Sequence, residues 1–374
     1  MPDRAKKTST IKDVALLAGC GIASTSRVLN QSGPVSAEMR AKVLAAAREL
    51  GFEFSDVGRS LRSQSTRIFG CVVPSISNPV YSVAVQGIQD VVIGSGRQLL
   101  LSCTNYDPDR ELAAVRALIA KRVEALILTV NDPKASAALD LIRSRDIPHC
   151  LLFNHDPGSP NACGVDNRAA AYALAQAFAA AGHRHLIYVA LRLSSSDRAK
   201  QRRDGFETAC RDLGLDRPAI LEVDDHLGNL EADLTAFLQA HPRTTGIFAS
   251  NDQLAIATIA TLRKLGLRVP ADLSIAGFDG IEFGQMLEPT LATVVTDPYA
   301  MGRAAAGGVL SANPSAPAPI NAGSAGFFVR PGGSLGPARQ ETSQEKSLVE
   351  TLQRPHQLIP PRKKQETASE ERLL

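Results

Sequence analysis

Short apolar runs alternate with helical stretches through most of this 374-residue chain, and no other feature restricts its fold as strongly. Alternation at this spacing predicts parallel sheets with helices on both faces. The predicted strands are Ile68–Val73, Leu99–Cys103, Ala125–Leu128, Cys150–Phe153, Leu186–Val189, Ile220–Val223, Gly246–Ala249 and Leu273–Ala276. The predicted helices include Leu112–Lys121, Ala169–Ala181, Arg202–Leu213 and Leu254–Leu265.

These elements are too many for one ordinary sheet, since a block of about 270 residues exceeds the usual size of a single core. We therefore expect an α/β core of two parallel-sheet lobes, first divided near residue 160. The chain is expected to cross back near Thr293–Pro298, where the final helix and strand rejoin the first lobe. Ligands bind such sheets in the cleft outside the carboxyl ends of the strands.

Residues 9–54 show a different pattern, which predicts an all-α head. Thr10 and Asp13 have the spacing of a capping box, Gly19 ends the first helix, and Ser36 caps a third helix after a second one. A helix, a glycine turn and another helix form the helix-turn-helix pattern. The buried faces of the first and third helices are expected to hold Val14, Leu17, Ala18, Val43, Leu44, Ala47 and Leu50.

The second helix of such a motif enters the major groove with its N-terminal residues. Arg27 can donate two hydrogen bonds to guanine, and Ile22 and Ala23 can contact a thymine methyl. The candidates for base contacts are Ile22, Ala23, Ser24, Ser26 and Arg27, and those for phosphate contacts are Thr10, Ser24 and Asn30.

Charge favours DNA over the alternative, a helical hairpin that packs on protein. Residues 1–67 contain eleven Lys and Arg against six Asp and Glu, a net charge of +5, whereas the whole chain carries +3. A basic head on a slightly acidic body is typical of DNA binding.

The chain resembles the lactose/galactose repressor (LacI) family from about residue 9 to 335. The motifs are Ile-Lys-Asp-Val-Ala at 11–15, Leu-Ala-Gly at 17–19, Ser-Arg-Val-Leu-Asn at 26–30 and Gly-Arg-Ser-Leu at 58–61. The resemblance implies a DNA-binding transcriptional regulator, a repressor, with a periplasmic-binding-protein-like core. It also implies a homodimer on a pseudo-palindromic double-stranded operator and a small polar effector, such as a sugar or related metabolite.

The expected organisation is a basic arm (1–8), the head (9–54), a hinge (55–66), the two-lobe core (67–336) and a disordered tail (337–374). In the family the hinge Leu is a wedge in the minor groove, so Leu61 inherits that role; packing on its dimer mate is the compatible alternative. Gly58 stands where the family usually has Ala and costs ~1 kcal/mol in a helix. Residues 55–63 are therefore expected to become helical only on DNA.

Polar residues at the ends of predicted strands are the candidates for the cleft. Asn78 and Tyr81 follow the first strand, in a loop that matches the family's Pro-x-x-x-Asn-Pro pattern. Arg202 occupies the family's ligand-gripping position, and Asp279 follows Gly277-Phe278. The candidate ligand-binding residues are Asn78, Tyr81, Arg202, Phe248, Asn251, Asp252 and Asp279. For Asp252, capping of a helix is an equal alternative.

The sequence contains no nucleophile elbow, phosphate loop or dinucleotide fingerprint, so neither an enzyme nor a cofactor is expected. His183 and His185 lack partners at metal-ligand spacing, and a Gly-His pair at a helix C-terminus more often caps the helix and favours its dipole. The six scattered Cys indicate a reducing compartment, and no apolar run reaches membrane length, which predicts a cytoplasmic protein. A solute-binding or sensor protein whose DNA head is vestigial or has another partner is the alternative; a secreted form would need a signal peptide.

Overall fold

The computed structural model describes residues 9–30, 33–52, 66–155, 161–224, 226–311, 324–339 and Leu352. The head has three helices, α1 (Ile11–Leu17), α2 (Ile22–Leu29) and α3 (Ala37–Glu49). The Asp13 carboxylate accepts hydrogen bonds from the backbone N–H of Thr10 at 2.8 Å and from its hydroxyl at 2.7 Å. The predicted capping interaction therefore starts α1.

A small apolar core holds the head together. Val14, Val28 and Val43 meet at its centre and are at most 2% exposed. Leu17 and Leu44, expected in the core, are 46% and 43% exposed. That expectation was wrong: Leu17 ends α1 at the rim, and Leu44 lies about 100° around α3 from Val43.

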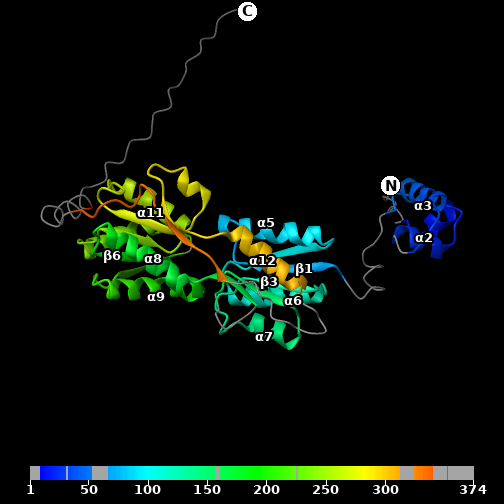
Figure 1. Cartoon of the computed structure of the whole chain (residues 1–374), viewed down its shortest axis with the longest axis horizontal. Helices are drawn as coiled ribbons and strands as arrows, with labels where there is room; N and C mark the ends of the chain where they lie inside the picture. The colour runs from blue at the N-terminus through cyan, green and yellow to red at the C-terminus, as the bar shows by residue number, and fades with distance from the viewer. Residues whose placement is uncertain are drawn as a thin grey trace, which may run out of the picture.

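The first lobe is built on a six-stranded sheet in the order β11-β5-β4-β3-β1-β2, and all its neighbouring strands are parallel. Its strands are β1 (Ile68–Val73), β2 (Gln98–Cys103), β3 (Ala125–Leu128), β4 (His149–Leu152), β5 (Ala162–Val165) and β11 (Ser324–Ala325). Its helices are α5 (Pro79–Gly94), α6 (Pro108–Ala120), α7 (Ala137–Ser144) and α12 (Pro298–Ser311). Figure 1 shows α5 and α12 on one side of this sheet and α6 and α7 on the other.

The second lobe repeats this plan in the order β12-β10-β9-β8-β6-β7. Its strands are β6 (Leu186–Leu191), β7 (Ala219–Val223), β8 (Gly246–Ala249), β9 (Ser274–Asp279), β10 (Ala292–Val295) and β12 (Phe328–Arg330). Its helices are α8 (Asn167–Ala180), α9 (Asp197–Asp212), α10 (Leu230–Ala240) and α11 (Asp252–Lys264), with 3-10 turns η1 (Leu193–Ser195) and η2 (Glu282–Gln285). The fold class predicted from the sequence is confirmed.

The chain crosses between the lobes three times: after β5, after β10 and after β11. The sequence predicted the first crossing and the return near Thr293–Pro298. It was wrong about the last strand, because β12 pairs antiparallel with β10 in the second lobe. The two-residue β11 in the first lobe lay below what a periodic pattern can reveal.

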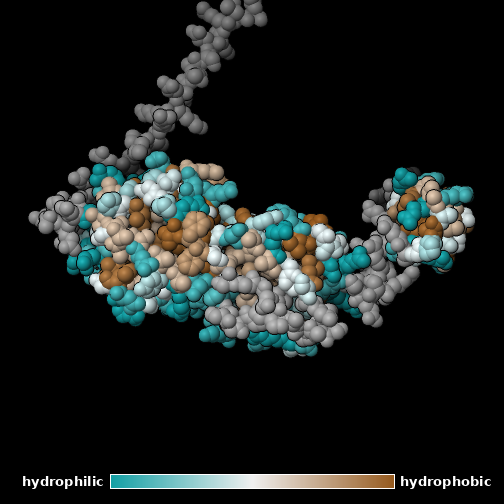
Figure 2. All heavy atoms as spheres, viewed as in Figure 1, coloured by the Kyte–Doolittle hydropathy of each residue, from teal (hydrophilic) through white to brown (hydrophobic). Residues whose placement is uncertain are grey.

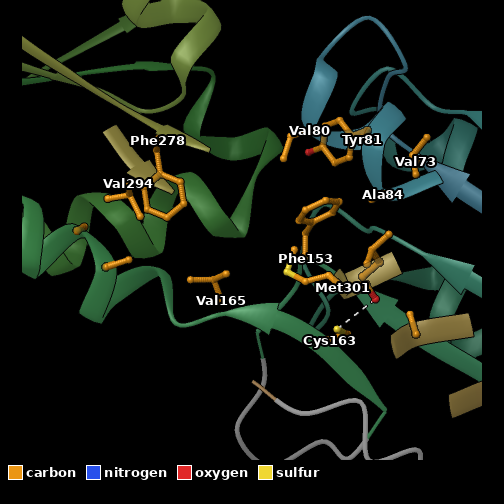
Figure 3. Packing of buried hydrophobic residues seen from close by; sticks show 14 of the residues in the cluster. Val73, Val80, Tyr81, Ala84, Phe153, Cys163, Val165, Phe278, Val294 and Met301 are labelled. Atoms are coloured by element: carbon orange, nitrogen blue, oxygen red, sulfur yellow. Dashed lines mark hydrogen bonds between the residues drawn. The ribbon is translucent and has the colours of Figure 1, made fainter. Parts of the chain in front are cut away.

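Buried apolar residues continue from one lobe into the other. Figure 3 shows Tyr81 and Phe153 of the first lobe near the boundary, with Phe278 and Val294 in the second, all members of one buried cluster. Within the first lobe, α5 and α12 approach closely at Gly302, which has no Cβ. A Cβ at this position would collide with the backbone of Ala84. The lobes thus share one continuous core beside the cleft.

Part of the predicted disordered tail packs on the second lobe, which corrects the boundary at 337. The Ala338 N–H donates to the Ala181 carbonyl at 2.8 Å, and Arg339 Nη2 donates to the Thr244 carbonyl at 2.8 Å. Leu352 is only 7% exposed and joins the buried cluster of this lobe. Hydrogen bonds hold Ala338 and Arg339, and apolar burial holds Leu352, in a segment whose polar composition predicted disorder.

Candidate functional site

The exposed face of α2 carries most of the residues expected to contact bases. Ile22 is 48% exposed, Ala23 and Arg27 are also exposed, and Ser24 is half-buried. They lie along one helix, and the N-terminal residues of this helix are those that a helix-turn-helix motif places in the major groove. In Figure 2 apolar residues are visible on the surface of the head among hydrophilic ones.

Two of the predicted DNA contacts are already engaged within the head. Ser26 is 9% exposed, and its hydroxyl accepts a hydrogen bond from Asn30 Nδ2 at 3.0 Å. The same amide donates to the Ser26 carbonyl at 2.8 Å. Ser26 was therefore misplaced among the base contacts, since it points toward the head's interior. Leu61 and the hinge at 55–63 lie outside the described residues.

The second site is a cavity between the lobes, at the carboxyl ends of β1, β6, β8 and β9. Both sheets have the doubly wound strand order in which ligands bind at this edge. The empty space, counting its open mouth and the solvent within it, is about 600 Å³. Its lining residues are Asn78, Val80, Tyr81, Tyr106, Phe153, Leu191, Arg192, Ser195, Ser196, Arg198, Ala199, Arg202, Ser250, Asn251 and Asp279.

Arg202 lines this cavity but is held by the protein on several sides. Its Nε donates to Asn167 Oδ1 at 2.8 Å, and its Nη1 donates to the Ser250 carbonyl at 2.6 Å. The guanidinium carbon lies 3.5 Å from the centre of the Phe278 ring, a cation–π contact. These contacts fix the plane of the guanidinium before any ligand arrives.

Asp279 faces Arg202 across 3.7 Å, too far for a direct hydrogen bond. Its φ of 120° is rare for any residue except glycine, and such strain gathers at functional sites. Burial raises the pKa of Asp279 to about 6, while Arg202, Arg198 and a hydrogen bond with Asn78 act to lower it. This carboxyl can therefore accept, or when protonated donate, a hydrogen bond to a ligand hydroxyl.

Asn78 and Asn251 each cap a helix and also line the cavity. The Asn78 side chain accepts from the Val80 N–H at 3.1 Å, and that of Asn251 accepts from the Leu254 N–H at 2.9 Å. Capping fixes the carbonyl oxygen of each amide and leaves the amide NH₂ for other partners.

Aromatic rings form the first-lobe wall of the cavity. Tyr81 and Phe153 stand edge to face with ring centres 5.1 Å apart, and Figure 3 shows the two side by side. The Tyr106 hydroxyl donates to the Tyr81 hydroxyl at 3.4 Å. Burial raises the pKa of Tyr106 well above its ordinary value, so this phenol stays protonated.

Two predicted ligand residues do not line the cavity. Phe248 is 0% exposed and packs edge to face on Tyr188, because its side chain alternates toward the helices that cover the sheet. Asp252, also 0% exposed, accepts from the N–H groups of Gly280 and Ile281, both at 2.8 Å, and from the Thr293 hydroxyl. Asp252 instead holds the loop that follows β9 in place.

Arg198 is the main cavity residue that the sequence analysis missed. The predicted helix began at Arg202, whereas α9 begins at Asp197, with the Ser196 hydroxyl accepting from the Ala199 N–H at 3.3 Å. The available signal was a serine before a charged helix start, after β6 and the η1 turn. Tyr106 and Arg192 carried no such signal.

Comparison with known proteins follows the same division into head and core. Residues 10–54 match the model described as "Bacterial regulatory proteins, lacI family", and residues 175–322 match "Periplasmic binding protein-like domain". The HTH-type transcriptional regulator GntR of Escherichia coli strain K12 is 32% identical over 336 residues, covering 88% of this chain and 99% of the relative. The ribose operon repressor of Halalkalibacterium halodurans is 31% identical and covers 79% and 87%.

Solved structures of LacI-family proteins have the same fold. A LacI-family regulator from Silicibacter pomeroyi superposes with a TM-score of 0.78 at 26% identity, covering 88% of this chain and 99% of that one. The lac repressor dimer bound to operator and the anti-inducer ONPF gives a TM-score of 0.76 at 23% identity, covering 88% and 100%, and supports the fold alone.

A helix-turn-helix head joined to a two-lobe ligand-binding core defines a DNA-binding transcriptional regulator. The chain belongs to the LacI family of bacterial regulatory proteins. The family and the regulatory function expected from the sequence are thereby confirmed.

No helix in the described residues is long and apolar enough to cross a membrane. The same ranges contain no group of three or more His, Cys, Asp and Glu side chains that could hold a metal ion. His183 instead lies buried, with Nδ1 2.9 Å from the Thr245 hydroxyl and Nε2 3.0 Å from the Gly336 carbonyl.

Proposed function

We propose that this chain is a homodimeric repressor whose operator affinity is set by a small hydroxylated anion bound between the lobes. One observation carries the choice of ligand. Among the described residues, Nη2 of Arg198 is buried and has no hydrogen-bond partner, although the residue lines the cavity. A buried donor of a charged group without a partner is costly, and a ligand carboxylate would satisfy it.

The balance of charge favours an acid over a neutral sugar. Arg192, Arg198 and Arg202 line the cavity, against Asp279 on the wall and Asp197 behind Arg198. Among the residues that line the cavity, three arginines therefore stand against one aspartate. Guanidinium groups bind carboxylates with matched pairs of N–H donors.

The remaining lining residues suit hydroxyl groups. Asn78, Asn251 and Asp279 offer amide and carboxyl groups, and Ser195 and Ser196 add hydroxyls. The Tyr81 and Phe153 rings provide an apolar wall for the carbon skeleton. One relative is named as the repressor of a ribose operon, which supports a ligand with several hydroxyls.

A homodimer follows from the head. One recognition helix covers only a few base pairs, so two heads on paired half-sites are needed for a specific operator. Closure of the lobes around a ligand would alter the spacing of the two heads. A ligand shifts this balance only as far as its affinities for the two states differ.

A thermal-shift screen tests the ligand class. Four- to six-carbon sugar acids are compared with the neutral sugars of the same skeleton, and a bound ligand raises the melting temperature by mass action. We expect a sugar acid to raise it, and Arg198→Ala to abolish the rise. Arg110→Ala, which removes an arginine that is 60% exposed on α6, is the matched control. An equal rise with Arg198→Ala refutes the site.

Selection of bound sequences from a random duplex pool tests the DNA function. We expect the full-length chain to enrich duplexes that contain one pseudo-palindromic sequence. Arg27→Ala should relax one position in each half-site and cost about 1–3 kcal/mol. A pool with no enriched palindrome contradicts the repressor assignment.

A further inference from the structure

The first turn of α9 belongs to the second lobe but bonds directly to the first. The Asp197 backbone N–H donates to the Asn131 carbonyl at 2.8 Å. Arg198 Nη1 donates to the Val130 carbonyl at 2.9 Å. Asn131 and Val130 follow β3, so these bonds cross the boundary beside the cavity.

Asn154 adds a side-chain bond across the same boundary. It follows β4 in the first lobe and is 0% exposed. Its Oδ1 accepts from the Val130 N–H at 3.0 Å, and its Nδ2 donates to the Val130 carbonyl at 2.9 Å. Nδ2 also donates to Asp197 Oδ1 at 2.9 Å. Since two bonds fix the amide within its own lobe, it offers Asp197 a rigid donor.

Asp197 in turn holds Arg198. Its Oδ1 accepts from Arg198 Nη1 at 2.9 Å, and the two side chains are only 9% and 5% exposed. Nη1 is thus shared between Asp197 and the Val130 carbonyl. Nη2 is left as the end of the guanidinium without a partner among the described residues.

We propose that Asp197 is a positioning residue that, through Asn154, presents Arg198 to the ligand only while the lobes are closed. The proposal rests on the proposed function, because presentation of Arg198 matters only if the cavity binds an anion. Separation of the lobes breaks the bonds to Val130, Asn131 and Asn154 together. Arg198 and Asp197 then become hydrated, and the guanidinium loses its fixed orientation.

This arrangement gives the ligand different affinities for the two states. In the closed state the fixed Nη2 binds a carboxylate without further ordering, whereas in the open state it must first be desolvated and oriented. The cross-lobe bonds and the ligand therefore favour the same conformation. Coupling of this kind lets a contact inside the cavity act on the lobes as a whole.

Hydrogen exchange on the ligand-free, full-length chain tests the cross-lobe bonds. We expect Asn154→Ala to speed exchange in peptides covering residues 195–199 at least tenfold, with the strand amides of β6 and β8 unchanged. Thr129→Val is the matched control, because the buried Thr129 hydroxyl donates to the Leu152 carbonyl within the first lobe only. Exchange within twofold of the parent chain, or an equal increase with Thr129→Val, overturns the proposal.

Phenylglyoxal modification, followed by mass spectrometry, tests the position of Arg198 itself. The parent chain should protect Arg198, and both Asn154→Ala and Asp197→Asn should raise its rate of modification at least tenfold, with the exposed Arg110 as internal reference. If Asn154→Ala does not fold, Asp197→Asn alone decides in both measurements. Unchanged protection of Arg198 overturns the proposal. Neither assay contains a ligand, so failure of every sugar acid in the thermal screen leaves these results valid.

Discussion

The two lobes have the same strand order, yet they give the cavity different chemistry. The first lobe contributes the rings of Tyr81, Tyr106 and Phe153, whereas the second contributes Arg192, Arg198, Arg202 and Asp279. Repetition of the fold fixes where the cavity lies, at the carboxyl ends of both sheets. The residues that follow each strand decide what it binds.

The difference implies that the two lobes contact different parts of the ligand. Rings and the helix-capping amide of Asn78 in the first lobe line the space proposed for a carbon skeleton. Charges in the second lobe, two of them fixed by hydrogen bonds within the protein, select the polar groups of the ligand. Because both lobes line the cavity, the proposed ligand would contact both.

The strongest test of the second lobe concerns Asp252, whose carboxylate supports the loop after β9. Asp252→Ala should lower the free energy of unfolding by roughly 3 kcal/mol, because buried N–H groups of Gly280 and Ile281 lose their acceptor. Urea denaturation followed by circular dichroism measures the change. Asp140→Ala, which removes an exposed pair with Arg143, should cost less than about 1 kcal/mol. Equal costs would show that Asp252 has no special supporting role.

The next test compares one residue from each lobe in ligand binding. Arg198→Ala should weaken binding of a sugar acid by about 30- to 100-fold, since a charge-assisted hydrogen bond in a buried site contributes ~2–3 kcal/mol. Tyr81→Phe keeps the ring and removes only a hydroxyl, so about a threefold loss is expected. Titration calorimetry gives both values. A larger loss of affinity with Tyr81→Phe than with Arg198→Ala would show that the first lobe, not the second, binds the polar groups of the ligand.

The third test varies pH, and it draws on one buried carboxyl from each lobe. Burial raises the pKa of Glu111 in the first lobe and of Asp252 in the second, each to about 7. An acid with a raised pKa binds more protons folded than unfolded, so its contribution is present at low pH. That contribution is lost as pH rises from about 4.5 through 7.

The free energy of unfolding should therefore fall as pH rises from 5 to 7.5. Glu111→Gln should flatten this slope, because a neutral amide does not titrate. Thermal melts across the range measure it, with Asp140→Asn on the exposed side of α7 as the control. A free energy of unfolding that rises over this range would mean that the pKa values of these carboxyls are lowered, not raised, in the folded chain.

The sequence predicted the frame of the molecule better than its cavity. Strands Ala125–Leu128 and Gly246–Ala249 have the bounds expected from their apolar runs. Periodicity and glycine turns also gave the three head helices, because these signals are local. Asp279 and Asn251 line the cavity as expected from their places at the ends of strands, and Arg202 lines it as the family resemblance implied.

Features that depend on distant contacts were not predictable. Phe248 looked like a cavity ring, but its strand turns it toward Tyr188. Arg198 was not singled out from the sequence, because its place in the cavity depends on α9 beginning at Asp197 and docking on the first lobe. The burial of Leu352 likewise depends on an apolar surface that no local pattern describes.

The proposed function requires a cavity that selects a hydroxylated anion. Titration calorimetry of a sugar acid and the neutral sugar of the same skeleton, against the full-length chain, tests this most directly. The account predicts that the acid which stabilises the protein binds at least about tenfold more tightly than its neutral match, the effect of one charge-assisted hydrogen bond. Equal affinities, or tighter binding of the neutral sugar, would contradict it.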